Sequence, residues 1–223
     1  MRIIEHFYGL LAPHDCIICG SEGNLICSNC SARHLFPVPS RCYRCNKVSD
    51  KSSTCPTCRQ YSVLKYVWVR TGYNEMTKQL VHALKFKFAK DVAKTIAREL
   101  AAIIPELSSE TIIVHVPAAT THVRQRGFDQ SAVIARELSK LTRLRHVHAL
   151  GRLGQQRQVG AASQLRLKQM SEAFRSISSI VKEANILLVD DVLTTGATLE
   201  SAALALRGAG AKSVSAVVFA QAI

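Results

Sequence analysis

The chain has 223 residues and a formal net charge of +13 at pH 7, and 48% of its residues are hydrophobic. This length fits one ordinary domain with a small additional module, and the apolar content excludes a wholly disordered chain. No apolar run approaches the roughly 20 residues that span a bilayer, so a transmembrane protein is not expected.

The first 15 residues do not have the pattern of a secretory signal peptide. Glu5 and His6 interrupt the apolar stretch, and no small-residue cleavage site follows. The apolar positions have the spacing of an amphipathic helix that packs on the body of the protein, with a helix at a membrane surface as the alternative. We therefore expect a cytoplasmic protein that begins with a short leading helix.

All eight cysteines lie before residue 59 and form four Cys-x-x-Cys pairs. The pairs are Cys16/Cys19, Cys27/Cys30, Cys42/Cys45 and Cys55/Cys58. One such turn directs two thiolates at one metal ion, and two turns complete a tetrahedral zinc site. We predict two zinc ions in a zinc-ribbon module over residues 1–60. A disulfide framework fits poorly with the reducing cytosol, and a single zinc ion is the stronger alternative.

The order of the cysteine pairs leaves two ways to build these sites. In sequential pairing, the first pair joins the second and the third joins the fourth, whereas interleaved pairing joins the first with the third. We favour sequential pairing because the short gaps suit zinc-ribbon hairpins, and Pro37 and Pro39 separate the two halves. This region has few large apolar side chains, so metal binding would supply much of its folding energy.

From residue 61 onward the sequence predicts alternating strands and helices. Strands are expected over 63–71, 111–116, 186–189 and 213–219, and helices over 74–84, 86–104, 129–141 and 198–206. The runs before Pro117 and Asp190 lack alternation, which is typical of strands buried on both faces of a parallel sheet. The alternation of strands and helices predicts a doubly wound α/β sheet over residues 61–223.

The most informative segment is ILLVDDVLTTGAT, residues 186–198. Its apolar strand ends in Asp190 and Asp191, at the edge where open α/β sheets bind ligands, and we expect both carboxylates to be within reach of solvent. Gly196 lets the backbone turn close to a ligand, and the following N–H groups, Thr hydroxyls and helix N-terminus form an anion cradle. Carboxylates beside an anion cradle suit the hydroxyls and phosphate of a ribose 5-phosphate. The alternative is ordinary helix capping. Capping explains one acidic residue and one threonine, but it does not explain the whole succession of strand, two carboxylates, threonines and glycine.

The stretch VDDVLTTGAT resembles the PRPP-binding loop of type I phosphoribosyltransferases. This resemblance implies that Asp190 and Asp191 bind the ribose 2′- and 3′-hydroxyls, and that Mg²⁺ bridges the diphosphate and the ribose. By the same resemblance, the 5′-phosphate is held by Thr194, Thr195, Gly196, Ala197 and Thr198. The implied fold is the type I phosphoribosyltransferase-like sheet.

Several other segments narrow the resemblance to the ComF competence-protein family, which is also described as amidophosphoribosyltransferase-like. They are the four cysteine pairs, YNEMTKQLVHALKFKF, RGFDQ at 126–130 and AF at 173–174. The family joins an N-terminal zinc ribbon to this fold. Asp129 stands where the family usually has Asn, and Lys168-Gln169 stands where it often has an Arg-Asn pair.

The ComF resemblance implies a factor of natural transformation that handles single-stranded DNA, with other DNA-uptake proteins as partners. An active phosphoribosyltransferase with an unidentified acceptor is the alternative. The glutamine-using amidophosphoribosyltransferase activity is excluded, because every cysteine is assigned to metal and no N-terminal catalytic cysteine exists.

Two groups of basic residues are candidates for anion binding. In the family fold, the segment 117–127 holds the pyrophosphate loop, so Arg124, Arg126 and Gly127 would contact the diphosphate; the alternative is that both arginines are solvated. Residues 61–102 contain eight basic and three acidic residues, and residues 151–185 contain six and two.

The basic excess of these two segments predicts a track for single-stranded DNA beside the PRPP site. We assign this track to Lys85, Lys87, Arg166 and Lys168, because the first two alternate with phenylalanines in the pattern that suits stacked bases. A merely soluble basic surface, with both phenylalanines in the core, is the alternative.

Overall fold

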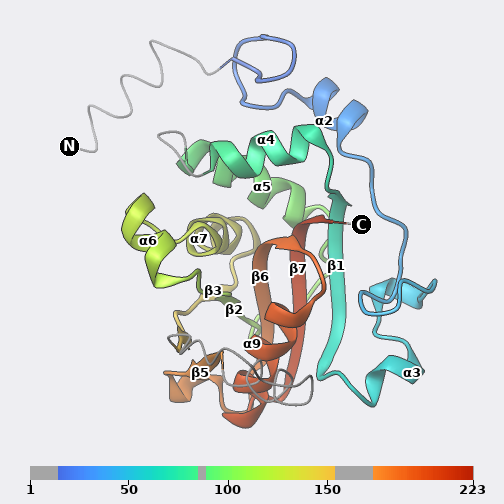
Figure 1. Ribbon diagram of the computed structural model, residues 1–223, viewed down its shortest axis with the longest axis vertical. Helices are drawn as coiled ribbons and strands as arrows, with labels where there is room; N and C mark the ends of the chain where they lie inside the picture. Colours follow the sequence, from blue (N-terminus) through green and yellow to red (C-terminus); the bar gives the residue numbers. More distant parts are fainter. Residues whose placement is uncertain (1–14, 85–88, 154–172, 223) are drawn as a thin grey trace, which may run out of the picture.

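The structure, a computed structural model, describes residues 15–84, 89–153 and 173–222. In these residues two small four-cysteine modules precede an α/β domain built on a central sheet (Figure 1). The expected leading helix lies outside the described residues. None of the helices within the described ranges is long and apolar enough to cross a membrane.

Five parallel strands form the main sheet, in the order β1-β7-β6-β2-β3. Their bounds are β1 Leu64–Gly72, β2 Ile112–His115, β3 Arg145–His146, β6 Asn185–Leu193 and β7 Ser213–Gln221. The chain continues in opposite directions from β2 and from β6, which are neighbours. This is the topological switch point at which open α/β sheets bind ligands. The predicted α/β class with a parallel sheet is confirmed.

Helices cover both faces of the sheet (Figure 1). One face carries α4 (Glu75–Ala83), α5 (Ala89–Ala101) and α7 (Gln130–Thr142), and the other carries α9 (Ala197–Gly208) and a hairpin of β4 (Leu150–Arg152) and β5 (Phe174–Ser176). Leu187 lies in the buried cluster of the first face and Leu188 in that of the second. This alternation is what a strand buried on both faces requires.

The observed elements differ from the predicted ones at a few positions. The second predicted helix ends at Ala101 rather than Ile104, and its expected start at Phe86 lies outside the described residues. The short helix α6 (Thr120–Arg126), the β4–β5 hairpin and the 3-10 turn η2 (Ser179–Val181) were not predicted. These elements are too short to show a periodicity of their own in the sequence.

The two modules share a backbone pattern. The N–H of Gly20 donates to the carbonyl of Cys16, and the N–H of Asn46 donates to that of Cys42, both at 2.8 Å. Gly20 and Asn46 both adopt the left-handed region, with φ of 73° and 60°. The second cysteine pair of each module then lies at a short helix, α2 (Ser28–His34) or α3 (Pro56–Arg59), and the turn η1 (Asp50–Ser52) precedes α3.

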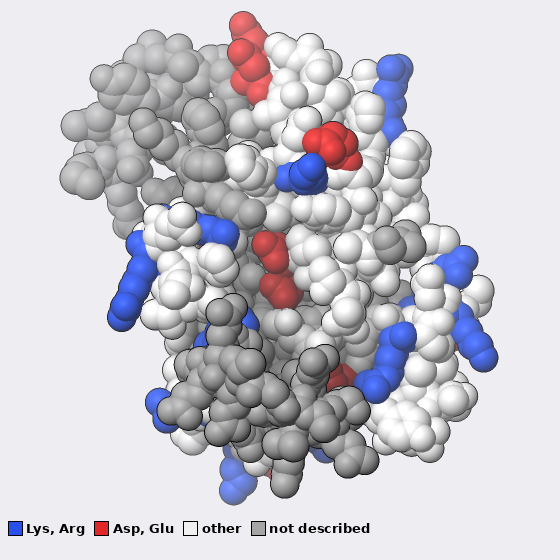
Figure 2. Space-filling view, viewed as in Figure 1, with Lys and Arg blue, Asp and Glu red and all other residues white. Residues whose placement is uncertain are grey.

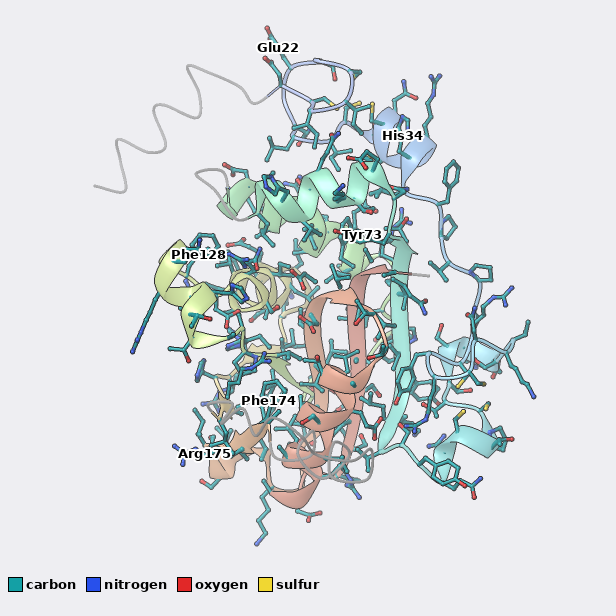
Figure 3. The ribbon with its side chains drawn as sticks, viewed as in Figure 1. Glu22, His34, Tyr73, Phe128, Phe174 and Arg175 are labelled. Atoms are coloured by element: carbon teal, nitrogen blue, oxygen red, sulfur yellow. The ribbon has the colours of Figure 1, made fainter. Side chains whose placement is uncertain are left out.

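The first module packs on α4 and α5, near the end of β1. Its Leu25, Ile26 and Leu35 join the buried cluster of that face. Ser31 donates to the carboxylate of Glu99 on α5 at 2.6 Å. In Figure 3, Glu22 and His34 mark this module and Tyr73 marks the chain just after β1.

The second module packs at the start of β1 and on the opposite face. Thr54 donates through its N–H to the carbonyl of Lys65 at 3.1 Å and through its hydroxyl to that of Leu64 at 2.7 Å. Tyr43 joins the buried cluster that contains α9. The two modules therefore contact the α/β domain at different ends of β1 and on different faces of the sheet.

Candidate functional site

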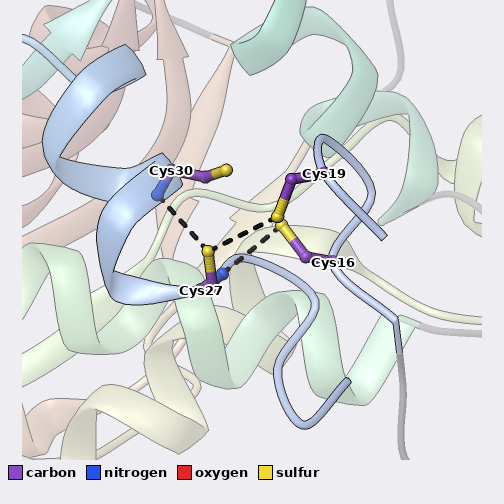
Figure 4. A group of neighbouring side chains, drawn as sticks. All are labelled: Cys16, Cys19, Cys27 and Cys30. Carbon is purple, nitrogen blue, oxygen red and sulfur yellow. Dashed lines mark hydrogen bonds between the residues drawn. The ribbon is translucent and has the colours of Figure 1, made fainter. Parts of the chain in front are cut away.

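The eight cysteines form two clusters, and each cluster joins consecutive pairs. Cys16, Cys19, Cys27 and Cys30 form one (Figure 4), and Cys42, Cys45, Cys55 and Cys58 form the other. Within each cluster, the sulfur atoms all lie within 4.8 Å of one another. The predicted sequential pairing is confirmed.

The sulfur geometry fits a tetrahedral metal ion. All eight cysteines are free thiols, and the sulfur–sulfur distances are 3.7 Å for Cys19–Cys27 and 3.6 Å for Cys45–Cys55. Disulfide sulfurs lie ~2.05 Å apart. A tetrahedron with Zn–S bonds of ~2.3 Å has edges of about 3.8 Å. The clusters are therefore arranged for two metal ions rather than for disulfides.

The thiols also have the electrostatics of metal ligands. The N–H of Cys30 donates to the sulfur of Cys27 and lowers the pKa of that thiol to about 6. Burial and the neighbouring thiols raise the pKa of Cys30 to about 12, and Cys58 in the other cluster has the same shift with the same causes. The pKa is also lowered for Cys16 in the first cluster and for Cys42 in the second, so each cluster holds thiols that ionise readily and one that resists deprotonation, which a bound cation promotes.

The segment after β6 has the strand–loop–helix geometry on which the predicted anion cradle depends, and it lies at the switch point. Strand β6 contains Asp190 and Asp191 and ends at Leu193, and α9 begins at Ala197. Gly196 is the N-cap of α9, with a φ of 78°. Of the predicted phosphate-binding residues, Thr194, Thr195 and Gly196 therefore form the loop, and Ala197 and Thr198 form the first turn of the helix.

The two carboxylates differ in their surroundings. Asp190 is buried, with its side chain accepting hydrogen bonds at 3.0 Å from the hydroxyl of Ser131 and from the N–H of Asp191. Burial and the charge of Asp191 raise the pKa of the Asp190 carboxyl above its ordinary value. Asp191 is only half-buried. The expectation that both carboxylates are within reach of solvent is therefore wrong for Asp190, which lies beneath α7.

Three consecutive residues at the start of α7 connect the parts of the site. Asp129 is the N-cap and accepts from the N–H of Ala132, while its other oxygen accepts from the N–H of Ala118 at 2.8 Å. Gln130 accepts from the guanidinium of Arg126, and Ser131 donates to Asp190. The sequence of this segment indicates only the family resemblance, and its connecting role is evident only in the structure.

The predicted pyrophosphate loop is partly helical. Arg124 and Arg126 lie in the last turn of α6, and Gly127 is its left-handed C-cap with a φ of 80°. Arg124 is exposed, whereas Arg126 is half-buried and is held by Gln130. Asp129 fixes the backbone of Ala118 just after β2, so both ends of this segment are attached to α7.

Tyr43 brings the second module into contact with the anion cradle. A Cβ atom added to Gly196 would lie 2.7 Å and 2.9 Å from two carbons of the Tyr43 ring. The Tyr43 hydroxyl donates to the carboxylate of Glu200, in the first turn of α9. Glu200 also accepts from the hydroxyl of Ser62 at 2.7 Å and from the N–H of Val63 at 2.8 Å. The sequence gives no signal for this contact, because it links residues more than 150 positions apart.

Three histidines gather at the ends of β2 and β3. The rings of His115 and His146 lie 5.2 Å apart between centroids, and those of His115 and His148 lie 4.8 Å apart. Burial and the nearby His146 and His148 lower the pKa of His115 to about 3. His115 is therefore neutral near pH 7, so it adds no positive charge for an anion at this edge.

The four residues assigned to the DNA track, Lys85, Lys87, Arg166 and Lys168, lie outside the described residues. On the face shown in Figure 2, Lys and Arg side chains lie mainly around the margin, and several gather over the second module. Acidic side chains lie near the centre of that face and toward its top. Basic charge in the described part of the chain is therefore peripheral on this face.

Phe174, from the predicted family element at 173–174, is buried beside α9 (Figure 3). The guanidinium carbon of Arg152 lies 5.3 Å from the centroid of its ring. Phe174 therefore anchors the hairpin to the face that carries the anion cradle.

Comparison with known proteins gives a family and distant relatives. Residues 92–222 match the phosphoribosyl transferase domain family. The chain is 28% identical to competence protein ComFC of Bacillus subtilis (strain 168) over 229 residues, covering 90% of this chain and 92% of that protein. It is 29% identical to DNA utilization protein YhgH of Salmonella typhimurium (strain LT2) over 230 residues, covering 92% of this chain and 96% of that protein.

Among solved structures, the glutamine phosphoribosylpyrophosphate (PRPP) amidotransferase from B. subtilis is similar to 57% of this chain, with a TM-score of 0.42 and 17% identity. The similar region spans about a quarter of that enzyme, 26% of its length. By its matching domain, the chain belongs to the phosphoribosyl transferase domain family, and over its length it is a distant homologue of ComFC and YhgH, the ComF family.

Proposed function

We propose that this protein is a cytoplasmic factor that handles single-stranded DNA in natural transformation or DNA utilization, and that it carries a binding site for PRPP or a related ribose phosphate. The observation that carries the proposal is the combination, in one chain, of an anion cradle at the switch point with full-length similarity to a competence protein and a DNA utilization protein. Other DNA-uptake proteins are its expected partners.

In the proposed ribose-phosphate site, the two halves of the ligand meet different groups. The half-buried Asp191 and the small part of Asp190 that stays accessible, 9%, accept hydrogen bonds from the ribose hydroxyls, while the backbone and hydroxyls of Thr194–Thr198 hold the 5′-phosphate at the N-terminus of α9. Arg124, Arg126 and the backbone near Gly127 lie on the neighbouring segment after β2 and serve the diphosphate. Mg²⁺, when bound with PRPP, supplies positive charge to the diphosphate.

Zinc is the metal that we propose for both cysteine clusters. Four thiolates in a tetrahedron favour Zn²⁺ among the common divalent ions, and small modules of this kind fold only with the metal bound. The sulfur spacing and the absence of disulfides support this assignment over the described residues.

An active phosphoribosyltransferase with an unidentified acceptor is the second candidate. The retention of both carboxylates and the whole phosphate loop favours it, because a pure DNA-binding protein has no need of them. Catalysis of this kind relies on positioning and on electrostatic stabilisation of the developing charge. A PRPP-dependent product formed with a nucleobase acceptor would distinguish this candidate from the first.

Replacement of Asp190 and Asp191 by Asn tests the ribose-phosphate site. The double variant should lose PRPP binding, measured by titration calorimetry with Mg²⁺ present, and should keep its zinc content. Because the pKa of Asp190 is raised in the folded state, its contribution to stability is present at low pH and is lost as the pH rises. Asp190→Asn alone should therefore unfold at an equal or higher temperature at pH 7. Unchanged PRPP affinity in the double variant would remove these residues from the site.

A further inference from the structure

The N-terminal ends of the sheet strands carry two neighbouring pockets that the ribose-phosphate site does not use. The smaller, of about 360 Å³, lies between the second module and the starts of β1 and β7. The larger, of about 780 Å³, continues onto the face that carries α5. Lys65 and Ser213 line both, so the two pockets form one groove around this edge of the sheet.

The smaller pocket has a strong positive charge. Four of its seven lining residues are Arg59, Lys65, Arg207 and Lys212, and none is acidic. All four are exposed, and none forms an ion pair with a carboxylate in the described part of the chain. Arg207 also donates to the carbonyl of Lys212 at 2.6 Å, which orients its guanidinium at the end of α9. Cations gathered from three parts of the fold without an acidic partner are the arrangement that binds phosphates.

The larger pocket adds an aromatic surface beside these cations. Tyr66 and Trp68 on β1 both line it, with stacked rings whose centroids are 5.5 Å apart and whose planes differ by 12°. The Lys65 ammonium lies 5.4 Å from the centroid of the Tyr66 ring. Ile103 and Leu107 extend the apolar wall, and Glu106 is the one acidic residue of the lining.

The second module completes this groove. Arg59 on α3 lines the smaller pocket, and Lys51 in η1 lines the larger one. The backbone of Ser53 pairs with that of Tyr66, which fixes the position of the module on β1. The second module and the α/β domain therefore each supply cations to the same groove.

We propose that this groove binds single-stranded DNA, with backbone phosphates at the smaller pocket and a base against Tyr66 in the larger one. Cations next to a half-buried aromatic ring match a strand whose bases are unstacked, because stacking within a duplex covers the base faces. This inference rests on the proposed DNA-handling function and places it at the strand starts, whereas the ribose-phosphate site lies at the opposite end of β6. Both sites can then be occupied together.

Trp68 allows a direct test, because it is the chain's single tryptophan. Titration of the zinc-loaded protein with unlabelled oligothymidylate should change its tryptophan emission. The midpoint of this change should equal the midpoint of a second titration, in which binding of the labelled strand is followed by fluorescence anisotropy. A duplex of the same length should change the emission less, because its base faces are covered. Anisotropy that shows strand binding without any change in Trp68 emission would overturn the proposal.

Matched charge variants test the phosphate pocket. The groove variant is Lys65→Ala/Arg207→Gln/Lys212→Ala, in which glutamine keeps a donor at the end of α9. The control variant is Lys78→Ala/Lys94→Ala/Lys140→Ala, which removes equal charge from exposed positions on α4, α5 and α7. We expect the groove variant to weaken oligothymidylate binding by about tenfold or more, and to reduce the salt slope by about 2, at ~0.7 per phosphate.

Tyr66→Leu should weaken strand binding by about tenfold, since stacking on one base is worth ~1–3 kcal/mol. All variants should keep PRPP affinity and zinc content, which shows that they are folded. If the wild-type protein binds no single strand, the proposed function and this inference fail together. If the wild type binds and the groove variant behaves as the control variant does, the inference alone is overturned.

Discussion

The two four-cysteine modules have the same turn at their first cysteine pair but make different contacts with the α/β domain. The first is attached to α5 through Ser31 and Glu99, and Arg70 on β1 donates to Glu99 at 2.7 Å. The second is attached to α9 through Tyr43 and Glu200. In both, one glutamate of the α/β domain holds the module.

What differs is the distance of each glutamate from the candidate ligand site. Glu99 lies in the last turns of α5, on the face opposite α9. Glu200 lies in the first turn of α9, directly after the phosphate loop, and Tyr43 fills the space beside Gly196. We infer that the first module serves mainly the stability of the fold and that the second also holds the phosphate loop in place.

The largest expected effect comes from removing one metal site at a time. Cys42→Ser/Cys45→Ser and Cys16→Ser/Cys19→Ser should each lower the zinc content from two ions to one per chain, because each cluster needs its four thiolates. Only the change in the second module should also lower PRPP affinity, by about tenfold or more, since Tyr43 packs on the loop and misplacing a positioned group by about 1 Å is costly. Elemental analysis measures the zinc content, and titration calorimetry measures the PRPP affinity. Equal loss of PRPP affinity in the two variants would contradict the division of roles.

The sequence predicted those features whose signal is local. The spacing of Cys16 through Cys58 was sufficient to predict two four-cysteine clusters, and the apolar run before Asp190 was sufficient to predict a buried strand that leads to the candidate ligand site. The helix predicted from residue 74 is also observed, and Asn74 caps it by accepting from the N–H of Thr77. Each of these depends on residues a few positions apart.

Features that depend on distant residues were not predictable in this way. The contact of Tyr43 with Gly196 and Glu200, and the burial of Asp190 under Ser131, depend on how the sheet folds. The basic groove was missed because its cations come from α3, β1 and the end of α9, and no stretch of sequence holds them together. The charge count pointed to a polyanion but not to this position.

Removal of the two glutamates compares the attachments directly and should have an intermediate effect. Glu200→Ala removes the acceptor of three hydrogen bonds, and Glu99→Ala removes the acceptor of two, one from a guanidinium. Each should lower the free energy of unfolding by about 2 kcal/mol, because hydrogen bonds to a charged group are worth ~1.5–3 kcal/mol. Urea titration measures this loss.

The glutamate variants should differ in ligand binding although their stability losses are similar. PRPP affinity should fall in Glu200→Ala, whose change lies beside the phosphate loop, and should be retained in Glu99→Ala. Reduced PRPP affinity in both, in proportion to lost stability, would mean that the site responds to stability in general and not to the position of the second module.

The smallest expected effect is that of Tyr43→Phe, which keeps the ring beside Gly196 and removes only the hydroxyl. The hydroxyl of the buried Tyr43 bonds to Glu200 and Ser62, and two of the three hydrogen bonds to the Glu200 carboxylate, from Ser62 and from the N–H of Val63, remain without it. The expected loss of stability is about 1 kcal/mol. PRPP affinity should fall no more than about threefold, because the contact that shapes the loop is the ring. Tyr43→Ala, which removes the ring, should instead approach the effect of losing the second metal site. If Tyr43→Phe weakens PRPP as much as Tyr43→Ala does, the hydrogen bond to Glu200 rather than the packing on Gly196 positions the loop.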